Sequence, residues 1–399
     1  MSLNNLVCTV GVGCLKFVLG AVYTVMKLLP SRNKVVFLSR QNSRPSLDFQ
    51  LLRVSLCKVD PTLEIVMITR KLEKNIPSAL RFGWYSLVSM YHLATSKVCV
   101  LDSYWPVVSL LRHKPSLTVI QMWHAIGKLK QSGYQTLGKG YGRKKKLAEL
   151  MYMHKGYDVV IAGGKSMNPY YCASFGVQES QLYNIGLPRI DYLLENVQCN
   201  REMLYECYPE FQGKTVVLYV PTFRRGTTAD YSHLIESFRK ENYALIIKPH
   251  PYQVMTDPES LVPFRCDRLD TMQALDACDI VITDYSAISL EAATLCKPIY
   301  FYLFDYQEYL RNNGVNINPY LEMPDNVYES AEQLIDAIKN GRYNMESLQA
   351  FRNRYLPENL GTSTDRLTRL IMDCVKDGKY EGIRKNLHRE TEATVPMGH

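Results

Sequence analysis

The 399-residue sequence lacks the short motifs that mark several large enzyme classes. It contains no GxxxxGK[ST] loop and no GxGxxG fingerprint, so neither a P-loop nor a dinucleotide-binding turn is indicated. Its 11 cysteines are scattered without a CxxC or CxxxC pair, which argues against a zinc site and favours a reducing compartment. A DxD sequence and a histidine-rich ligand run are also absent. No cofactor is therefore required by the sequence, although Mg²⁺ accompanying a diphosphate substrate is compatible with it.

Strong charge excess and low-complexity tracts are absent as well. The net charge is +8, from 47 basic and 39 acidic residues. This balance favours phosphates or anionic lipid surfaces as partners and does not indicate nucleic acid. A hydrophobic fraction of 46% is typical of globular proteins, and the length suits two or three domains.

Residues 6–29 are almost wholly apolar, yet they lack the basic start and cleavage site of a signal peptide. Lys16 lies in the middle of this stretch, and with Thr9 and Lys27 it falls on one narrow polar stripe of a helix. The pattern predicts that residues 1–30 contain an amphipathic helix lying in a membrane interface, with its lysines reaching the headgroups. The alternatives are a helix packed on the first domain and a membrane-spanning helix.

From residue 33 onward, short apolar runs alternate with longer amphipathic stretches, which is typical of βαβ units and buried parallel sheets. The predicted strands are residues 34–39, 64–69, 97–102, 117–122 and 158–163, then 215–220, 244–248, 279–283 and 298–303. The polar segment 194–214 between the two series is interpreted as a hinge. We therefore predict an α/β protein with two doubly wound, Rossmann-like domains, residues 31–195 and 200–375, which face a central cleft. Residues 376–399 are expected to form a frayed polar tail.

Histidines follow two of the predicted strands. His124 lies in "MWHAIGKLK", which follows the predicted strand 117–122, and His250 lies in "KPHP", which follows the predicted strand 244–248. A lone histidine is usually structural, but the carboxyl ends of strands in this architecture face the ligand cleft. Two histidines at matching positions, each near lysine, therefore indicate a functional pair.

A candidate anion site follows the other strands of the second half. Arg224 and Arg225 suit bidentate phosphate recognition, and Ser286 is a good N-cap for a helix whose first N–H groups would face an anion. Glu291, further along that helix, would accept from ribose hydroxyls. Solvated loop arginines and a merely well-capped helix are the alternatives. The predicted donor-binding residues are Arg224, Arg225, Lys248, Thr283, Asp284, Ser286, Ala287 and Glu291.

The concentrated basic run "GKGYGRKKK" covers residues 138–146. A solvated helix start explains it without any function. A glycine-rich basic loop near the cleft, together with an interfacial helix, would instead hold an anionic lipid-linked substrate. The predicted acceptor or membrane residues are Gly127, Lys128, Lys130, Arg143, Lys144, Lys145 and Lys146.

Five ordered motifs between about residue 33 and residue 370 resemble the CDP-glycerol glycerophosphotransferase family, the teichoic-acid primases and polymerases with a GT-B-type fold. They are "MWHAIGKLK", "NIGLPRIDYL", "VPTFRR", "KPHP" and "TDYSAISLEAATLCKPIYFY". The resemblance implies transfer of an alditol phosphate from a CDP-alditol donor to a hydroxyl of a membrane-linked acceptor, either a lipid or a polyol-phosphate chain, with release of CMP. It also implies that His124 and His250 are the central catalytic pair, with Arg224, Asp284 and Ser286 near the donor.

Within that expectation, His124 is the candidate general base, since a neutral imidazole suits proton abstraction. His250, Lys248 and Arg224 would hold the diphosphate and stabilise the leaving group. The two histidines could exchange roles. No additional N-terminal domain like that of the polymerases precedes the motifs, which argues against long-chain polymerisation.

The interfacial helix and the reducing compartment together predict a peripheral protein at the cytoplasmic face of the cell membrane. Two other functions are compatible with this sequence. One is a GT-B sugar transferase or nucleotide-sugar epimerase that uses a UDP-sugar. The other is a catalytically inactive scaffold that binds anionic lipid.

Overall fold

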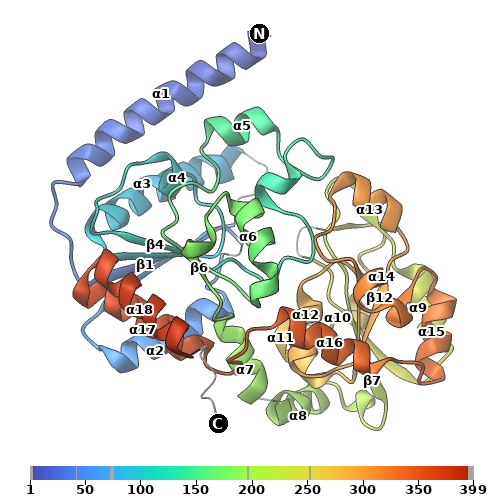
Figure 1. The fold of residues 1–399 in the computed structure, drawn as a ribbon. Coiled ribbons are helices and arrows are strands. Elements are labelled where there is room, and N and C mark those ends of the chain that lie inside the picture. The colour runs from blue at the N-terminus through green and yellow to red at the C-terminus, as the bar shows by residue number, and fades with distance from the viewer. Residues whose placement is uncertain (1–2, 42, 72–75, 196, 251–252, 394–399) are drawn as a thin grey trace.

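The computed structural model describes residues 3–41, 43–71, 76–195, 197–250 and 253–393, and it contains two parallel sheets with helices packed against them (Figure 1). The first sheet has the order β2-β1-β3-β4-β5-β6 and the second has the order β13-β12-β11-β7-β9. The predicted α/β class with two doubly wound domains is confirmed. The first sheet consists of β1 (Lys34–Ser39), β2 (Glu64–Thr69), β3 (Val98–Leu101), β4 (Thr118–Gln121), β5 (Val159–Ile161) and β6 (Leu182–Tyr183).

The second sheet consists of β7 (Thr215–Val220), β9 (Tyr243–Ile247), β11 (Ile280–Thr283), β12 (Ile299–Tyr302) and β13 (Val327–Tyr328), and β8 (Thr228–Ala229) pairs separately with β10 (Val254–Met255). Every predicted strand is present. The short strands β6, β8, β10 and β13 were not predicted, because two residues carry no recognisable periodicity.

The helices of the first half are α1 (Leu3–Met26), α2 (Leu47–Val59), α3 (Ile76–Thr95), α4 (Pro106–Leu110), α5 (Lys145–Leu150), α6 (Asn168–Phe175) and α7 (Pro188–Glu195). Those of the second half are α8 (Val197–Cys207), α9 (Ser232–Arg239), α10 (Val262–Arg265), α11 (Thr271–Ala277), α12 (Ile288–Thr294), α13 (Tyr306–Asn312), α14 (Pro319–Glu322), α15 (Ala331–Lys339), α16 (Met345–Tyr355), α17 (Ser363–Asp377) and α18 (Lys379–Ala393). Single 3₁₀ turns are η1 (Gly133–Thr136), η2 (Lys165–Met167), η3 (Glu179–Gln181), η4 (Pro209–Phe211) and η5 (Pro324–Asn326).

The segment expected to be a hinge contains helix α8, which packs against α11. Asn200 on α8 donates to the Asp276 carboxylate at 2.6 Å, and both side chains are buried. This segment is therefore an integral part of the second domain.

After α16 the chain returns to the first domain, so the second domain does not extend to residue 375 as expected. Helix α17 packs on α2, and Lys97 Nζ donates to the Val375 carbonyl at 2.7 Å. Helix α18 then packs on α17, so the expectation of a frayed polar tail needs correction for residues 379–393. Gly382 allows this close approach, since a Cβ there would lie 2.5 Å from the Cys374 nitrogen. Average polarity does not reveal such a contact.

Helix α1 projects along the outside of the first domain (Figure 1). Residues 9–26 are long and apolar enough to cross a membrane, yet only 6% of them are buried. Phe17 is 78% exposed, so the alternative of a helix packed into the core is not supported. Tyr23 is its buried anchor, with its hydroxyl 2.7 Å from His113 Nδ1.

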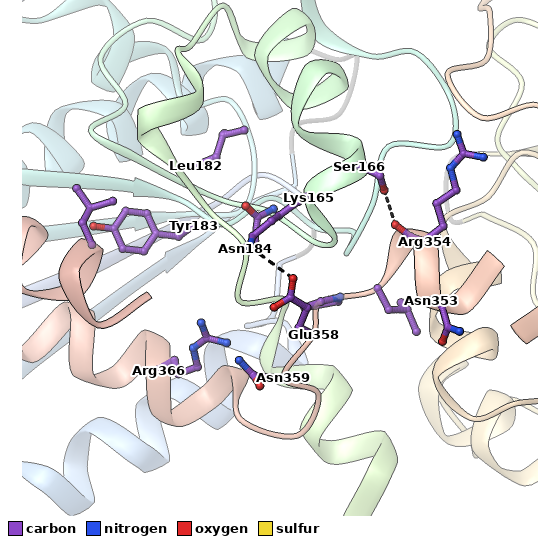
Figure 2. A pocket seen from close by; sticks show the side chains of 13 residues that line it. Lys165, Ser166, Leu182, Tyr183, Asn184, Asn353, Arg354, Glu358, Asn359 and Arg366 are labelled. Atoms are coloured by element: carbon purple, nitrogen blue, oxygen red, sulfur yellow. Dashed lines mark hydrogen bonds and ion pairs between the residues drawn. The ribbon is translucent and has the colours of Figure 1, made fainter. Parts of the chain in front are cut away.

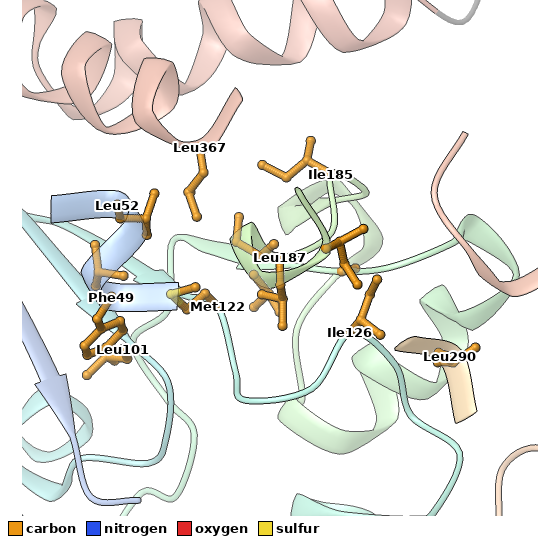
Figure 3. Close-up of a cluster of buried hydrophobic side chains, with 14 of the residues drawn as sticks. Phe49, Leu52, Leu101, Met122, Ile126, Ile185, Leu187, Leu290 and Leu367 are labelled. Atoms are coloured by element: carbon orange, nitrogen blue, oxygen red, sulfur yellow. The ribbon is translucent and has the colours of Figure 1, made fainter. Parts of the chain in front are cut away.

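The apolar core of the first domain reaches into the second (Figure 3). Leu290 on α12 contacts the loop after β4 so closely that a Cβ on Gly127 would lie 2.0 Å from Leu290 Cδ1. Leu367 on α17 joins the same cluster. The two domains are therefore in direct contact behind the cleft.

A buried ionic group accompanies this apolar contact. Arg189 on α7 binds the Asp48 carboxylate through Nε at 2.9 Å and through Nη2, and its Nη1 lies 3.7 Å from Glu291 Oε1 on α12. Asp48 and Glu291 are each 2% exposed. Arg189 thus links a carboxylate of each domain, where an unpaired charge would be costly.

We expect Arg189→Ala to lower the free energy of unfolding by about 3 kcal/mol or more, because it leaves two buried carboxylates without their counter-charge. Urea unfolding of the full chain measures this loss. The control is Lys165→Ala, which removes only the exposed ion pair with Glu358 and should change stability little. Equal losses in the two variants would contradict the structural role of Arg189.

Candidate active site in the interdomain cleft

A cavity of about 240 Å³ lies between the two domains. The first domain contributes Arg40, Lys130 and Arg143, and the second contributes Arg225. Among the described residues that line this cavity, none carries a carboxylate. The cavity therefore offers concentrated positive charge to an anionic ligand.

His124 follows β4 where the chain turns sharply, and it lies behind the cavity residues Trp123 and Gln41 without lining the cavity itself. The turn places Trp123 at φ 60°, and the Trp123 and His124 rings stack with centroids 4.1 Å apart. His124 Nδ1 lies 3.0 Å from the Asp102 carbonyl oxygen and 3.0 Å from Gln41 Nε2. When Nδ1–H donates to the Asp102 carbonyl, Nε2 keeps its lone pair, which is the tautomer that a general base requires; when Nδ1 instead accepts from the Gln41 amide, Nε2 carries the proton.

The pKa of His124 is lowered to about 3, chiefly by burial and also by the charges of Lys128, Arg189 and Lys130, although the hydrogen bond to the Asp102 carbonyl acts in the opposite direction. The imidazole is therefore neutral near pH 7. An anionic substrate in the cleft would raise this pKa, because it favours the charged form of a neighbouring base.

His250 follows β9 and is half-buried. Its ring stacks on Phe223, a wall residue of the cleft, with centroids 5.1 Å apart and planes at 27°. Burial lowers the pKa of His250 to about 4, and Lys130 and Lys71 lower it further. Both histidines therefore contact a wall residue of the cavity, His124 through Trp123 and His250 through Phe223, although neither histidine lines the cavity itself. Pro251, the last residue of "KPHP", lies outside the described residues.

Arg224 is held by partners within its own domain. Its Nε lies 2.5 Å from Asp305 Oδ2, and its Nη1 lies 2.9 Å from Asp284 Oδ2. Asp284 also accepts from the Thr222 backbone N–H at 2.9 Å, and all these groups are buried or nearly so. Arg224 and Asp284, which the sequence predicts to contact a donor, therefore hold together the loops after β7, β11 and β12. Thr283 is buried as well, and its hydroxyl donates to the Val220 carbonyl at 2.8 Å.

Two more predicted donor-binding residues, Lys248 and Glu291, bind partners outside the cavity. Lys248 Nζ donates to the carbonyl oxygens of Cys266 and Leu269, at 2.8 and 2.7 Å. Glu291 faces Arg189 in the buried ionic group and does not reach the cavity. The structure therefore gives both residues supporting roles, which differs from the sequence expectation.

The start of helix α12 also differs from the one expected from the sequence. Helix α12 begins at Ile288 with Ala287 in the N-cap position, and no side chain caps it. Ser286 Oγ accepts only a long bond of 3.4 Å from the Ile288 N–H. Ser286 and Ala287 are half-buried, while every residue of this seven-residue helix is buried.

The predicted acceptor residues divide into buried and cleft-facing groups. Lys128 is 2% exposed, and its Nζ lies 4.0 Å from the Trp123 ring and 3.9 Å from the Phe175 ring. Gly127 is buried against Leu290, so neither residue can reach a membrane or an acceptor. Lys130 and Arg143 line the cavity, Lys144 lines a neighbouring groove, Lys145 is exposed on α5, and Lys146 is half-buried.

The cavity residues Arg40, Gln41 and His154 carry charged or hydrogen-bonding side chains but were not predicted from sequence. Arg40 and Gln41 follow β1, so the strand-end argument that identified His124 would have found them too. His154 precedes β5 and carries no such signal. It is 4% exposed, adopts φ 64°, and places its Nδ1 3.0 Å from the Tyr157 hydroxyl. Only the folding of its loop against η1 brings it to the cleft.

A separate cavity of about 260 Å³ lies where the segment between α16 and α17 crosses the first domain (Figure 2). Lys165 approaches Glu358 at 3.4 Å there, and Ser166 donates to the Arg354 carbonyl. None of the predicted site residues lines this cavity. The interdomain cleft is the better candidate for the active site.

Within the described part of the chain, no group of three or more histidine, cysteine or acidic side chains could hold a metal ion. Asp284 and Asp305 at the strand ends of the second domain are engaged by Arg224. The described residues therefore do not fit a protein-held Mg²⁺ ion, and no step below depends on one.

Comparison with known proteins assigns the chain to a family. The family model of CDP-Glycerol:Poly(glycerophosphate) glycerophosphotransferase matches residues 21–373. The chain belongs to this family. This glycerophosphotransferase-family chain is 27% identical over 379 residues to the teichoic acid ribitol-phosphate primase of Bacillus spizizenii, covering 91% of the chain and 97% of that relative. It is 30% identical over 297 residues to the teichoic acid glycerol-phosphate primase of Bacillus subtilis, covering 72% and 76%.

Solved structures support the fold of this family member. The wall teichoic acid polymerase TagF, in a variant combined with CDPG, superposes with a TM-score of 0.70 at 16% identity, covering 94% of this chain and 99% of that one. A putative UDP-N-acetylglucosamine 2-epimerase from Listeria monocytogenes reaches 0.54 at 13% identity, covering 88% and 98%. The predicted family and GT-B-type fold are confirmed, and the chain is a phosphotransferase. The UDP-sugar and inactive-scaffold alternatives are not favoured.

The adjacent residues Arg224 and Arg225 should respond differently to substitution. We expect Arg224→Ala to lower the free energy of unfolding by about 3 kcal/mol, since it leaves Asp284 and Asp305 buried without their partner. Arg225 is exposed and lines the cleft. Arg225→Ala should hardly change stability but weaken CDP binding about tenfold or more, the loss of one charge-assisted contact.

Urea unfolding and calorimetry with CDP measure the two effects on the same preparations. Unchanged stability in Arg224→Ala would mean that its ion pairs do not support the fold. Unchanged CDP affinity in Arg225→Ala would place that arginine outside the ligand site.

Proposed function

We propose that the chain transfers glycerol phosphate, or a related alditol phosphate, from a CDP-alditol to a hydroxyl group of a teichoic-acid-type acceptor and releases CMP. The observation that carries this proposal is a basic cleft without a carboxylate among its described lining residues, in which the wall residues Trp123 and Phe223 contact the rings of His124 and His250. Family membership and the primase relatives give the same class of reaction. The work of such a site is positioning and charge stabilisation.

In the proposed step, His124 Nε2 takes the proton from the acceptor hydroxyl. The hydroxyl oxygen then bonds to the phosphorus that carries the alditol, and the bond from that phosphorus to the bridging oxygen breaks, so that CMP leaves with the electron pair. Lys130 and Arg225 stabilise the charge that develops on the phosphate oxygens. His250, from the second domain, donates a hydrogen bond to the departing phosphate.

We further propose that the chain acts as a peripheral protein at the cytoplasmic face of the membrane, on a lipid-linked acceptor. Helix α1 supports this location, because it exposes Phe17 (78%) and Val25 (67%). A large exposed apolar surface of this kind is expected to be covered by another apolar phase.

The reaction is tested by CMP release from CDP-glycerol, CDP-ribitol and a UDP-sugar, each offered with a lipid-linked acceptor. We expect turnover with a CDP-alditol only. His124→Ala and His250→Ala should each lower it about 100-fold or more, the usual contribution of general acid–base or charge-stabilising groups.

His233→Ala is the matched control, because His233 is a surface residue paired with Glu332 and should keep wild-type turnover. Thermal unfolding checks that the variants remain folded. Wild-type turnover in a folded His124→Ala protein would remove His124 from the mechanism, and turnover with the UDP-sugar alone would overturn the proposed reaction.

The membrane proposal is tested by flotation with anionic phospholipid vesicles. The double change Phe17→Glu with Val25→Glu should shift the chain from the vesicle fraction to the soluble fraction, because it places two charges on the apolar surface of α1. Val54→Glu, on an exposed position of α2 (54%), should leave flotation unchanged. Undiminished flotation of the double variant would rule out α1 as the membrane contact.

A further inference from the structure

A second cavity, of about 420 Å³, adjoins the cleft between α3, α4 and α5. Its wall is formed largely by the apolar side chains of Phe82, Pro106, Leu147, Ala148 and Met151. We call it the apolar groove. None of the proposed catalytic steps uses it.

The inner end of the apolar groove is continuous with the basic cleft. Arg40, Tyr104, Arg143 and Arg225 line both cavities. The Arg40 guanidinium lies 5.7 Å from the Phe82 ring and 5.5 Å from the Tyr104 ring, and that of Arg143 lies 5.8 Å from Tyr104. Among the described lining residues of the groove, as in the cleft, there is no carboxylate. An apolar channel therefore ends in a cationic one.

The outer end of the groove lies near α1. Leu147 on the groove wall is 44% exposed, and Tyr152 just beyond α5 is 41% exposed. Lys16 of α1 places its Nζ 3.5 Å above the Tyr152 ring. Trp84, on the same helix as Phe82, is 65% exposed. Leu147 and Tyr152 thus place exposed apolar surface between α1 and the groove.

We propose that the apolar groove binds the first carbons of the alkyl or isoprenyl chain of a lipid phosphate, whose phosphate lies against Arg40, Arg143 and Arg225. The inference rests on the proposed function, because it gives the lipid-linked acceptor a binding site of its own. The occupant follows from charge and polarity: apolar walls suit a hydrocarbon chain, and the cations at the inner end suit an anionic headgroup. The continuity with α1 favours a membrane lipid over a soluble metabolite.

The test is calorimetry on the full chain with alkyl phosphates from butyl to octyl, below their micelle concentrations, and with inorganic phosphate. In the wild type, affinity should rise about fourfold for each added methylene that enters the groove. Ala148→Trp fills the groove and should abolish this dependence while leaving inorganic phosphate binding unchanged. Ala173→Trp, the same change at an exposed site on α6, should keep it.

A second variant covers the case in which Ala148→Trp does not fold. Leu147 is partly exposed, and Leu147→Asn should at least halve the gain per methylene without affecting inorganic phosphate. An unchanged chain-length dependence in a folded groove variant would overturn the proposal. Equal affinities for alkanols and alkyl phosphates of the same length would overturn the phosphate part of it.

These measurements contain no CDP-alditol, so their outcome is independent of catalysis. A protein that releases no CMP but binds alkyl phosphates in the groove would refute the proposed function alone. A protein that transfers alditol phosphate but shows no groove-dependent binding would refute the inference alone.

Discussion

Arg189 and Arg224 each lie against two buried or nearly buried carboxylates, and the character of the site depends on this pairing. Arg189 binds Asp48 and approaches Glu291, and Arg224 binds Asp284 and Asp305. Charges in these positions need partners, because an unpaired buried charge is strongly destabilising. The pairs fix the strand-end loops and connect the domains. They also leave the lining of the cleft, in the part of the chain described, to cations.

Burial also shifts the pKa values of the ionisable side chains near the cleft. Burial lowers the pKa of His124 to about 3, that of His250 to about 4 and that of Lys130 to about 8. Each shift disfavours the charged form, so an arriving diphosphate would raise all three pKa values together. Lys130 would then keep its charge at higher pH, and His124 would become a stronger base. Substrate binding and chemical competence are thus linked by one electrostatic field, without a conformational change.

The sequence identified the elements well where a local pattern exists. Buried parallel strands are continuous apolar runs, and their carboxyl ends located His124 and His250. Prediction from the sequence failed where the role of a residue depends on a partner far along the chain. Arg224 and Arg225 are neighbours with the same side chain, but Asp305, 81 residues away, binds Arg224 and not Arg225. Likewise, Lys128 is enclosed by aromatic rings whereas Lys130 faces the cleft. The packing of α18, which depends on Gly382, carried no polarity signal either.

The order of surfaces from α1 inward explains why the two domains contribute differently. The first domain carries the exposed helix, the wall of the apolar groove and three of the cleft cations, the features on which the proposed lipid-linked acceptor site depends. The second domain brings His250 and Arg225 to the opposite side. Arg225 also reaches the Gly142 carbonyl of the first domain at 3.3 Å and lines both cavities. A single exposed arginine therefore lies where donor and acceptor phosphates would meet. Its side chain can serve both because, unlike Arg224, it is not bound into a buried carboxylate pair.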